Sequence, residues 1–385
     1  MTEIKVAVGG IEKTDFYING GKMSEAVVTE DRIKEVLKGR PVLVTGADGF
    51  VGSHLTEKLI ELGANVHVFV RATSSGMLHN LAHVREKIVV HRGDLTDKQA
   101  VTVALRVLKS QGGAPVIFHL GAQAHVGESW NRPYETLATN VLGTVNLLQS
   151  IVDLDMEVYR VDVAGSSEEY GNVREDMLKY YRFDKNGGLI LDEISPINPQ
   201  SVYATSKIAE DFLTRNYNKA YGLPTIVTRM FNNYGPRQNP RFVTGTIITQ
   251  ALSKDTITLG YVLAKRDFCF VRDGVMGHIH VALFGEPGDV YVYGYGETIS
   301  ILDWYNMIIR LGQEQKVWGE KTLVADTKDR GRLGKSEVEE LRVDYKKLNS
   351  LTGWKPNFSW EQGLREAINW YAGNREKWIG RVDWI

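Results

Sequence analysis

The chain has 385 residues and a formal net charge of -1, with 43% apolar and 24% charged residues. These values are typical of a globular protein, and the interspersed charges exclude a basic nucleic-acid face and a polybasic membrane surface, so neither partner is expected. The single cysteine, Cys269, excludes an internal disulfide. No apolar run approaches the roughly 18 residues that span a bilayer, and the first residues lack the apolar core of a signal peptide. A cytoplasmic protein is therefore expected.

The first segment, residues 1–39, is expected to be an N-terminal extension. It holds a short apolar run over 4–8, two Gly pairs and a charged, helix-compatible stretch over 24–38. From Arg40 the pattern changes to an apolar run, a Gly-rich turn, an amphipathic helix and a second apolar run. This order predicts a strand–helix–strand unit, whereas no function follows from the extension.

The Gly-rich turn is the first candidate binding site. Gly46, Gly49 and Gly52 stand at G-x-x-G-x-x-G spacing between the predicted strand and helix. Glycines permit a tight turn and let the backbone approach a pyrophosphate, whose charge is held by free N–H groups at the helix N-terminus. A structural turn in another α/β protein is the alternative, but the strand–turn–helix context favours a dinucleotide. We therefore predict cofactor binding by these glycines together with Phe50 and Val51.

Two further segments are candidates for the adenosine end of the cofactor. The second predicted strand ends at Arg71, and Thr73, Ser74 and Ser75 follow it. An arginine and hydroxyls suit a 2′-phosphate, which favours NADP over NAD, with Arg71 and Ser74 as ligands. An exposed loop arginine is the alternative. Asp94 follows the third strand-like run and is a candidate for the adenine amino group, or a plain turn aspartate.

Further strand-like runs alternate with helical patterns. They are Ile88–His91, Val116–Leu120, Val158–Val163 and Thr225–Met230, with helical patterns at Tyr134–Leu154 and Ser206–Tyr221. The alternation predicts an α/β fold with a Rossmann-type, doubly wound parallel sheet and helices on both faces. We expect this unit to take up mainly residues 40–235 and to bind NAD(P).

The segment "VDVAGSSEEYG" ends a predicted strand at the carboxyl edge of the sheet, where ligands of open α/β folds bind. Ser166 is a candidate to hydrogen-bond a reacting hydroxyl, and Glu168 a candidate to abstract a proton next to a newly made carbonyl. The alternative is that Ser166, Ser167 and Glu168 only cap the turn that follows.

The segment "SVYATSK" places Tyr203 and Lys207 four residues apart on one predicted helix face. An ammonium near a phenol, reinforced by a positively charged nicotinamide, stabilises the phenolate and brings its pKa towards neutrality. Such pairs also occur by chance on solvated helices. Placement after the fifth strand of a dinucleotide-binding sheet favours catalysis, with Tyr203 as the base.

The segment "MFNNYGPRQNPRF" is expected just past the sixth strand, at the mouth of the cleft. Its Asn232, Asn233, Arg237 and Arg241 are candidates for binding a sugar and a diphosphate, because guanidinium forks suit phosphate oxygens. A surface ion pair is the alternative for each arginine.

After Pro236 the alternation becomes less regular. A β-like run at Val290–Tyr293, a helix near Ile301–Gly312 and a last helix at Trp360–Tyr371 predict a smaller C-terminal α/β lobe. We expect this lobe to take up mainly residues 236–385, with some crossing of the chain between the two units, and to close over a substrate. None of the nine histidines has metal-ligand spacing, so no metal site is expected.

Five motifs in order resemble those of the extended short-chain dehydrogenase/reductase family, the NAD(P)-dependent nucleotide-sugar epimerases, dehydratases and reductases. They are "TGADGFVGSHL", "HLGAQAHVGESWNRPYETLATNVLGTVNLL", "GSSEEYG", "SVYATSK" and "FNNYGPRQ", and the resemblance runs from Pro41 to Tyr371. It implies an active site of Ser166, Glu168, Tyr203 and Lys207, and a homodimer that pairs through two helices of each subunit, including the one with Tyr203. It also implies cofactor contacts by Leu95, Leu120, Ala122, Asn140, Tyr203 and Lys207, and substrate contacts by His125, Ser166, Asn233, Arg266 and Arg332.

The branch of the family is indicated by the run Ser166, Ser167, Glu168. The dTDP-glucose dehydratases carry Thr-Asp-Glu at these positions, so this chain lacks their Asp. The GDP-mannose 4,6-dehydratases lack it too, and the chain therefore resembles them best. However, "NNYGPRQ" differs from their usual segment, and related 4-keto reductases also carry "SSEEYG". The leading hypothesis is 4,6-dehydration of GDP-mannose or a similar nucleotide sugar. A 4-epimerase or 4-keto reductase is the alternative, and a non-catalytic nucleotide sensor a remote one.

Overall fold

The structure is a computed structural model, and it describes residues 27–73, 75–330, 332–334 and 336–381. Ser74, predicted to bind the cofactor, lies outside these ranges, as does most of the expected N-terminal extension. The part of the extension that is described contains helix α1 (Glu30–Leu37), which begins at the N-cap Thr29 and buries Ile33 and Leu37. Within the described ranges, no helix is both long and apolar enough to cross a membrane.

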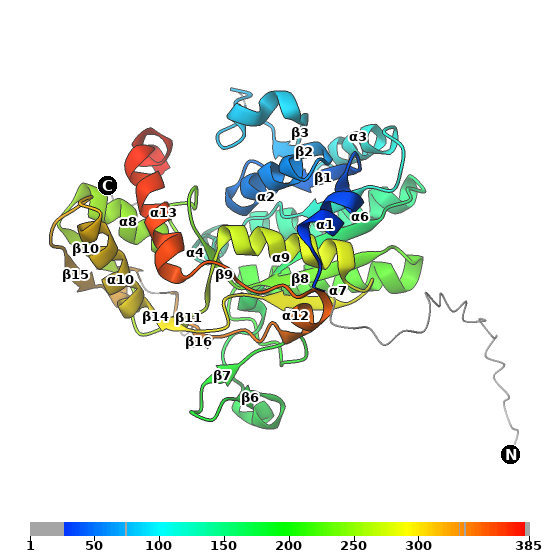
Figure 1. Ribbon diagram of the computed structural model, residues 1–385. Coiled ribbons are helices and arrows are strands. Elements are labelled where there is room, and N and C mark those ends of the chain that lie inside the picture. Colours follow the sequence, from blue (N-terminus) through cyan, green and yellow to red (C-terminus); the bar gives the residue numbers. More distant parts are fainter. Residues whose placement is uncertain (1–26, 74, 331, 335, 382–385) are drawn as a thin grey trace, which may run out of the picture.

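The core of the molecule is a parallel sheet of seven strands (Figure 1). In sheet order the strands are β13 (Val290–Tyr293), β8 (Thr225–Met230), β5 (Arg160–Ser166), β4 (Val116–His119), β1 (Pro41–Thr45), β2 (Asn65–Arg71) and β3 (Val89–Gly93). In β1 all five residues are buried, and Val42 and Val44 join a different core from Leu43. Both faces of the sheet are therefore covered, as the apolar run predicted.

Helices cover each face. On one face lie α3 (Lys98–Lys109), α6 (Gly143–Asp153) and α7 (Val202–Tyr221), and on the other lie α2 (Phe50–Glu61), α9 (Val271–Phe284) and α12 (Lys346–Thr352). This is the predicted doubly wound α/β fold. The strand order runs outward in both directions from the neighbouring β1 and β4. In such sheets the crevice for a ligand opens at this reversal, beyond the carboxyl ends of the strands.

The helix predicted over 134–154 is interrupted. The structure has α5 (Pro133–Leu137), one π-helical turn, η2 (Ala138–Leu142), and then α6. A π-turn inserts an extra residue into a helix and is frequent at functional sites. The periodicity of the sequence does not reveal it, because apolar residues continue on both sides of the turn.

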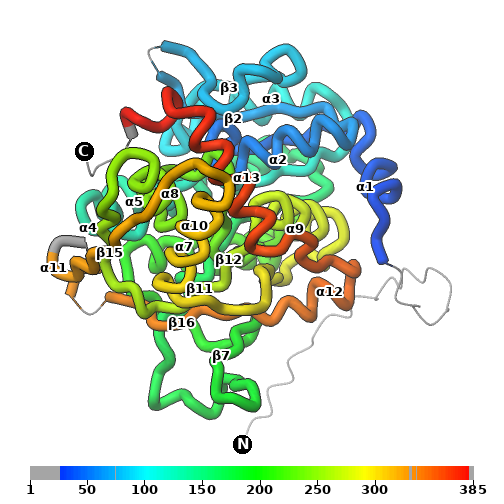
Figure 2. Tube along the Cα trace, turned by 60° about the vertical axis from the view of Figure 1, so that its left-hand side comes forward, coloured from blue at the N-terminus to red at the C-terminus, as the bar shows by residue number. Residues whose placement is uncertain are grey.

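The C-terminal lobe packs beside the sheet and sends part of the chain back to it (Figures 1 and 2). It contains α8 (Val243–Ser253), β10 (Thr256–Leu259), β11 (Lys265–Arg266), β14 (Ile299–Ser300), α10 (Ile301–Glu314), β15 (Thr322–Ala325), α11 (Thr327–Arg330), β16 (Glu340–Leu341), α13 (Trp360–Gly373), η5 (Arg375–Lys377) and η6 (Ile379–Arg381). The returning elements are α9, β13 and α12, which lie on or in the central sheet. One continuous apolar core joins α2, α9 and the lobe helices.

The remaining elements lie in connections around the sheet. They are η1 (Ala82–Lys87), α4 (Val126–Asn131), η3 (Ser167–Glu169), η4 (Glu175–Tyr180), β6 (Arg182–Phe183), β7 (Leu189–Ile190), β9 (Asn232–Tyr234) and β12 (Phe268–Phe270). The β6–β7 hairpin projects from the body (Figure 1), and Arg182 fastens it to Asp192 and Asp344. Strand β9 pairs in parallel with β12, so Asn233 lies opposite Cys269 in the lobe.

Candidate active site

The glycine turn between β1 and α2 is too tight for larger residues. Gly46 has a φ of 67°, and a Cβ there would lie 2.8 Å from the Cα of Gly121. A Cβ on Gly52 would lie 2.3 Å from the carbonyl oxygen of Gly46. Gly49 is the N-cap of α2 and provides no side-chain cap. The first N–H groups of α2, which include those of Phe50 and Val51, can therefore be offered to a phosphate.

A hollow of about 460 Å³ lies at the carboxyl ends of β2 and β3. Its lining includes Arg71, Asp94, Tyr134 and Thr139. Arg71 Nε lies 3.8 Å from Asp94 Oδ2, and both side chains are exposed. Hydrogen bonds from Thr96 and the charge of Arg71 lower the pKa of Asp94. The position and size fit the adenosine end of a dinucleotide whose pyrophosphate lies on the glycine turn.

Tyr203 and Lys207 lie on the first two turns of α7, because Ser201 caps that helix and its hydroxyl accepts from the backbone N–H of Ala204 at 3.0 Å. Both side chains are buried, and Lys207 Nζ donates to the carbonyl oxygen of Ala164 at 2.9 Å. Burial raises the pKa of Tyr203, while Lys207 and a hydrogen bond with Ser166 oppose the rise. Lysine alone therefore does not bring the phenol towards neutrality, so the sequence-based expectation depends on the additional charge of a nicotinamide.

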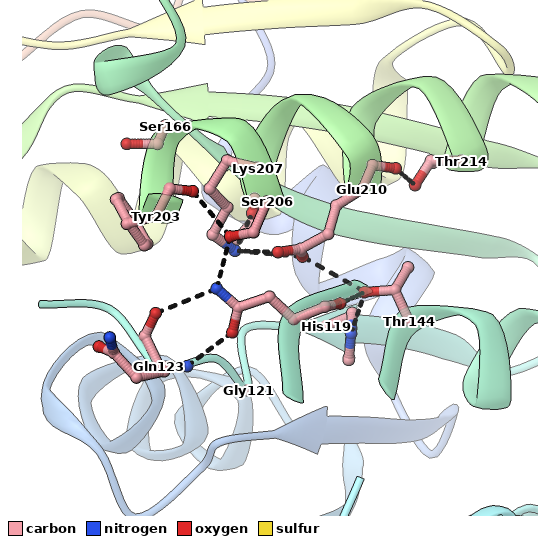
Figure 3. A network of polar contacts seen from close by, with 12 residues as sticks. His119, Gly121, Gln123, Thr144, Ser166, Tyr203, Ser206, Lys207, Glu210 and Thr214 are labelled. Carbon is pink, nitrogen blue, oxygen red and sulfur yellow. Dashed lines mark hydrogen bonds and ion pairs between the residues drawn. The ribbon is translucent and has the colours of Figure 1, made fainter. Parts of the chain in front are cut away.

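Ser166 is the last residue of β5, and Glu168 is in the short turn that follows. The Ser166 hydroxyl accepts from the backbone N–H of Glu168 at 3.2 Å, and the carboxylate of Glu169 accepts from that of Ser166 at 2.7 Å. The capping alternative from the sequence is thus present. Because the Ser166 oxygen accepts in this cap, its hydroxyl proton can still be donated to Tyr203. Figure 3 shows Ser166 and Tyr203 near each other at the start of α7.

Glu168 forms a two-pronged ion pair with Arg332 from the C-terminal lobe. The two guanidinium nitrogens donate to the two carboxylate oxygens, each at 2.8 Å. Burial alone would favour neutral Glu168, but the charge and hydrogen bonds of Arg332 lower its pKa. Arg332, expected to meet a diphosphate, is thus paired with the candidate base. Arg266 and Arg332 each lie 3.4 Å from a carboxylate oxygen of Glu337, so all four side chains form one cluster.

The other candidate substrate residues separate into three groups. Asn232 and Asn233 each bury a side-chain oxygen that has no hydrogen-bond partner, which suits a ligand. Arg241 pairs with Glu128 at 3.2 Å, and His125 Nε2 lies 3.3 Å from the carbonyl oxygen of Arg241, so these three residues lie together.

The third group is Arg237 alone. Arg237 was a candidate for the sugar diphosphate, but its guanidinium pairs with Glu57 at 2.8 Å and donates to the hydroxyl of Ser53 at 3.3 Å. Both partners lie on α2. The ion-pair alternative is therefore present for Arg237, which connects its loop to the helix behind the glycine turn, and diphosphate binding by Arg237 stays a prediction.

The loop after β4, which contains Leu120 and Ala122, is held by Asn140 from the π-turn. Asn140 accepts from the backbone N–H of Gln123 at 2.7 Å and donates to the hydroxyl of Ser206 at 2.8 Å. Leu95 packs against the same loop at Gly121. Contacts thus join the glycine turn after β1, Leu95 after β3, the loop after β4, Asn140 and α7.

Figure 3 shows three buried residues near Lys207 that the sequence did not predict. They are Glu210, Thr144 and His119, joined in that order to the lysine by hydrogen bonds. Glu210 had a sequence signal, because it is three residues beyond Lys207 and so on the same helix face. The other two come from β4 and α6 and had none. Over the ranges the structure covers, no three His, Cys, Asp or Glu side chains gather as metal ligands.

Comparisons with known proteins agree with this arrangement. A family model described as GDP-mannose 4,6 dehydratase matches residues 43–367. The dTDP-glucose 4,6-dehydratase 1 of Escherichia coli K12 is 30% identical over 358 residues, which are 89% of this chain and 95% of that protein.

Two solved structures are similar over most of their length. A dTDP-glucose 4,6-dehydratase from Streptomyces venezuelae, solved with NAD, has a TM-score of 0.74 and 28% identity and covers 89% of this chain and 100% of its own. The UDP-glucose 4-epimerase of Thermus thermophilus, also solved with NAD, has a TM-score of 0.72 and 26% identity and covers 87% of this chain and 99% of its own.

Proposed function

The chain belongs to the GDP-mannose 4,6 dehydratase family, among the NAD-dependent nucleotide-sugar dehydratases and epimerases, and we propose that it converts a nucleotide-linked hexose into its 4-keto-6-deoxy form. One observation carries the choice of dehydration. Beside Tyr203 and Ser166, the buried carboxyl of Glu168 is kept ionised by Arg332. Dehydration needs a base for the proton on C5, whereas C4 epimerisation and C4 reduction do not.

In the proposed reaction, Tyr203 removes the proton of the C4 hydroxyl while Ser166 hydrogen-bonds that oxygen and Lys207 stabilises the phenolate. The glycine turn and the hollow at Arg71 would hold NAD, which would supply the oxidation at C4 and return the hydride at C6. The 4-ketone acidifies C5, and Glu168 takes that proton. The C6 hydroxyl leaves as water with the proton on Glu168. When the hydride is returned to C6, C5 takes up a proton. The proton that Tyr203 removed from the C4 hydroxyl accounts for it.

The sugar nucleotide is proposed to be GDP-mannose or a close analogue. Ser167 occupies the position where dTDP-glucose dehydratases carry an acid, and its side chain is buried in the turn at Glu168. The sugar would lie beside this turn, within reach of Arg266, Arg332 and Asn233. We assign the sheet unit, mainly residues 40–235, to the cofactor, and the lobe, mainly 236–385, to the substrate.

We propose NAD as the working cofactor. Both similar structures described above hold NAD. Arg71 by itself favoured NADP, but the carboxylate of Asp94 lies 3.8 Å from it and would face a 2′-phosphate with like charge.

The test is a panel of GDP-mannose, dTDP-glucose and UDP-glucose, each supplied with NAD or NADP. A 4-keto-6-deoxy product, identified by mass and NMR, is expected from at least one of them. The panel also settles the cofactor, because a preference for NADP would assign Arg71 to its 2′-phosphate. Unchanged sugars throughout would refute dehydration.

Glu168→Gln separates dehydration from the alternatives. We expect product formation to fall by about 10²–10⁴-fold, the usual contribution of a positioned base, while reduction of bound cofactor by the sugar in a single turnover persists. Glu339→Gln, an exposed carboxylate on the segment that follows Arg332, is the matched control and should keep full activity. Equal loss of both steps in Glu168→Gln would favour a 4-epimerase or 4-keto reductase that uses Glu168 only for structure.

We also propose that the protein is a homodimer. Leu137, Leu142 and Phe212 are exposed apolar side chains on α5, η2 and α7. These three elements pack against one another. A second subunit placed on them would cover the apolar side chains and bring two copies of α7 together.

A further inference from the structure

A buried carboxylate lies one helical turn beyond the proposed catalytic lysine. Glu210 Oε1 is 3.1 Å from Lys207 Nζ, and the two side chains are 1% and 3% exposed. Figure 3 shows both side chains turned towards each other beneath α7. The next residue, Asp211, is engaged elsewhere, because it pairs with Arg229 at 2.8 Å. Glu210 is thus the carboxylate that contacts Lys207 directly.

A buried ammonium needs such a partner. Transfer of a lysine out of water favours loss of its proton, and a neutral amine would not stabilise a phenolate. Burial lowers the pKa of Lys207, but Glu210 first and Tyr203 next raise it, and it ends above its ordinary value. Burial also raises the pKa of Glu210, to about 7, while the charge of Lys207 opposes that rise. At 3.1 Å, the carboxylate therefore favours the charged form of the lysine.

Neutral groups hold the carboxylate in place. The Thr144 hydroxyl lies 3.3 Å from Glu210 Oε2, and His119 Nε2 lies 3.0 Å from the Thr144 oxygen. His119 Nδ1 in turn lies 2.8 Å from the hydroxyl of Thr45, next to the glycine turn. Burial lowers the pKa of His119 to about 3, so its ring is uncharged near neutral pH. Two strands and a second helix thus orient Glu210 without competing for its charge.

The remaining charged groups around the lysine are few. On α7 they are Tyr203 and Glu210 itself, and from η3 the carboxylate of Glu169 acts at longer range. Glu169 is already paired with Arg229 at 3.1 Å. From β4, the neutral His119 is the titratable side chain that faces this group.

From this arrangement we infer that Glu210 is a positioning residue, whose carboxylate keeps Lys207 protonated and fixed so that the lysine can stabilise the Tyr203 phenolate during C4 oxidation. The inference rests on the proposed function for the role of Tyr203. It adds a fifth residue to the expected set of Ser166, Glu168, Tyr203 and Lys207.

The test measures the charge of Lys207 directly in the full-length protein with NAD. Lysines are labelled with ¹³C at Cε, the Lys207 signal is identified by its absence in Lys207→Met, and its chemical shift is followed against pH. In Glu210→Gln, which keeps the shape but removes the charge, we expect the midpoint to fall by about one pH unit or more, a tenfold change in proton dissociation. Glu210→Asp should recover part of the fall.

Thr144→Val is the matched control. It removes a hydrogen bond to Glu210 and keeps the carboxylate, so its shift should be less than half that of Glu210→Gln. A purely structural role predicts the same Lys207 midpoint in Glu210→Gln as in the wild type, and that result would overturn the inference. The titration needs no substrate, so a failed sugar panel refutes the proposed function and leaves this measurement to decide on Glu210 alone.

A kinetic readout follows where the panel gives turnover. In Glu210→Gln, the rate of cofactor reduction should begin to fall with rising pH at a lower pH than in the wild type. The KM for the sugar nucleotide should stay within about twofold, because Glu210 lies behind the lysine and not among the candidate substrate residues. A change of KM with an unchanged pH profile would contradict the assignment.

Discussion

At the scale of single residues, burial decides how the site ionises. It raises the pKa of Tyr203 despite a lysine one turn away, and it raises the pKa of Glu210, which pairs with the same lysine, to about 7. Glu168 is the exception, since the Arg332 fork outweighs burial and lowers its pKa. Tyr203 and Glu168 thus differ in the direction of their pKa shifts, because only Glu168 has a counter-charge that outweighs its burial.

His119 gives a stability prediction with a definite sign. Its pKa in the fold, about 3, is below the unfolded value of 6.5, so its contribution is complete above pH 6.5 and is lost as pH falls towards 3. The free-energy difference between wild type and His119→Gln should therefore shrink by about 1.4 kcal/mol per pH unit below 6.5. Urea unfolding at pH 7, 6 and 5 measures it. The exposed His79→Gln is the control, and a difference that does not change with pH would contradict the prediction.

At the scale of elements, the start of α2 and the start of α7 set the geometry of the candidate site. The glycine turn brings α2 close to the loop after β4, and the cap at Ser201 places Tyr203 in the first turn of α7. The π-turn adds Asn140, which joins that loop to α7. Each device is a local backbone feature, and together they hold the loop after β4 against α7.

Gly52→Ala tests the glycine turn. The new Cβ would meet the carbonyl oxygen of Gly46 at 2.3 Å, and backbone on both sides cannot move aside cheaply. We expect a loss of about 1–3 kcal/mol of stability from overpacking and at least about tenfold weaker NAD binding, measured by calorimetry. Gly373→Ala, at the end of α13 with open space around it, should change stability by no more than about 0.5 kcal/mol. If Gly52→Ala bound NAD with unaltered affinity, the prediction that the pyrophosphate binds at this turn would be wrong.

At the scale of the whole molecule, the site is completed only where the lobe meets the sheet. Glu168 comes from the end of β5, whereas its partner Arg332 comes from the lobe, more than half of the chain length from the glycine turn. Arg266 and Arg332 converge on Glu337 from the same lobe. A ligand between the two units would therefore contact groups from both, and its binding depends on how they pack.

The proposed dimer is tested by charge. Leu142→Asp combined with Phe212→Asp places two carboxylates on η2 and α7, and burying them without partners is costly, so the variant should become monomeric in size-exclusion chromatography with light scattering. Val103→Asp, an exposed apolar residue on α3, is the control and should stay dimeric. A monomeric wild type would refute the dimer itself.

The sequence by itself determined the elements and the order of the site motifs. Alternating apolar runs and helical periods indicated the parallel sheet, because each strand must bury both faces, and three glycines marked the turn at its first strand. It also paired Tyr203 with Lys207, since i, i+4 spacing places both on one helix face.

Only the tertiary structure decided which charges meet. The pairing of Glu168 with Arg332 and of Arg237 with Glu57 joins segments whose separation in the chain carries no periodic signal. The same holds for the contacts of Thr144 and His119 with the Glu210–Lys207 pair, although that pair itself is three residues apart on one helix. The π-turn at Asn140 was hidden for a related reason, because its apolar flanks continue the helical pattern. Local spacing fixes what a segment forms, whereas long-range packing and burial fix how its side chains ionise and bind.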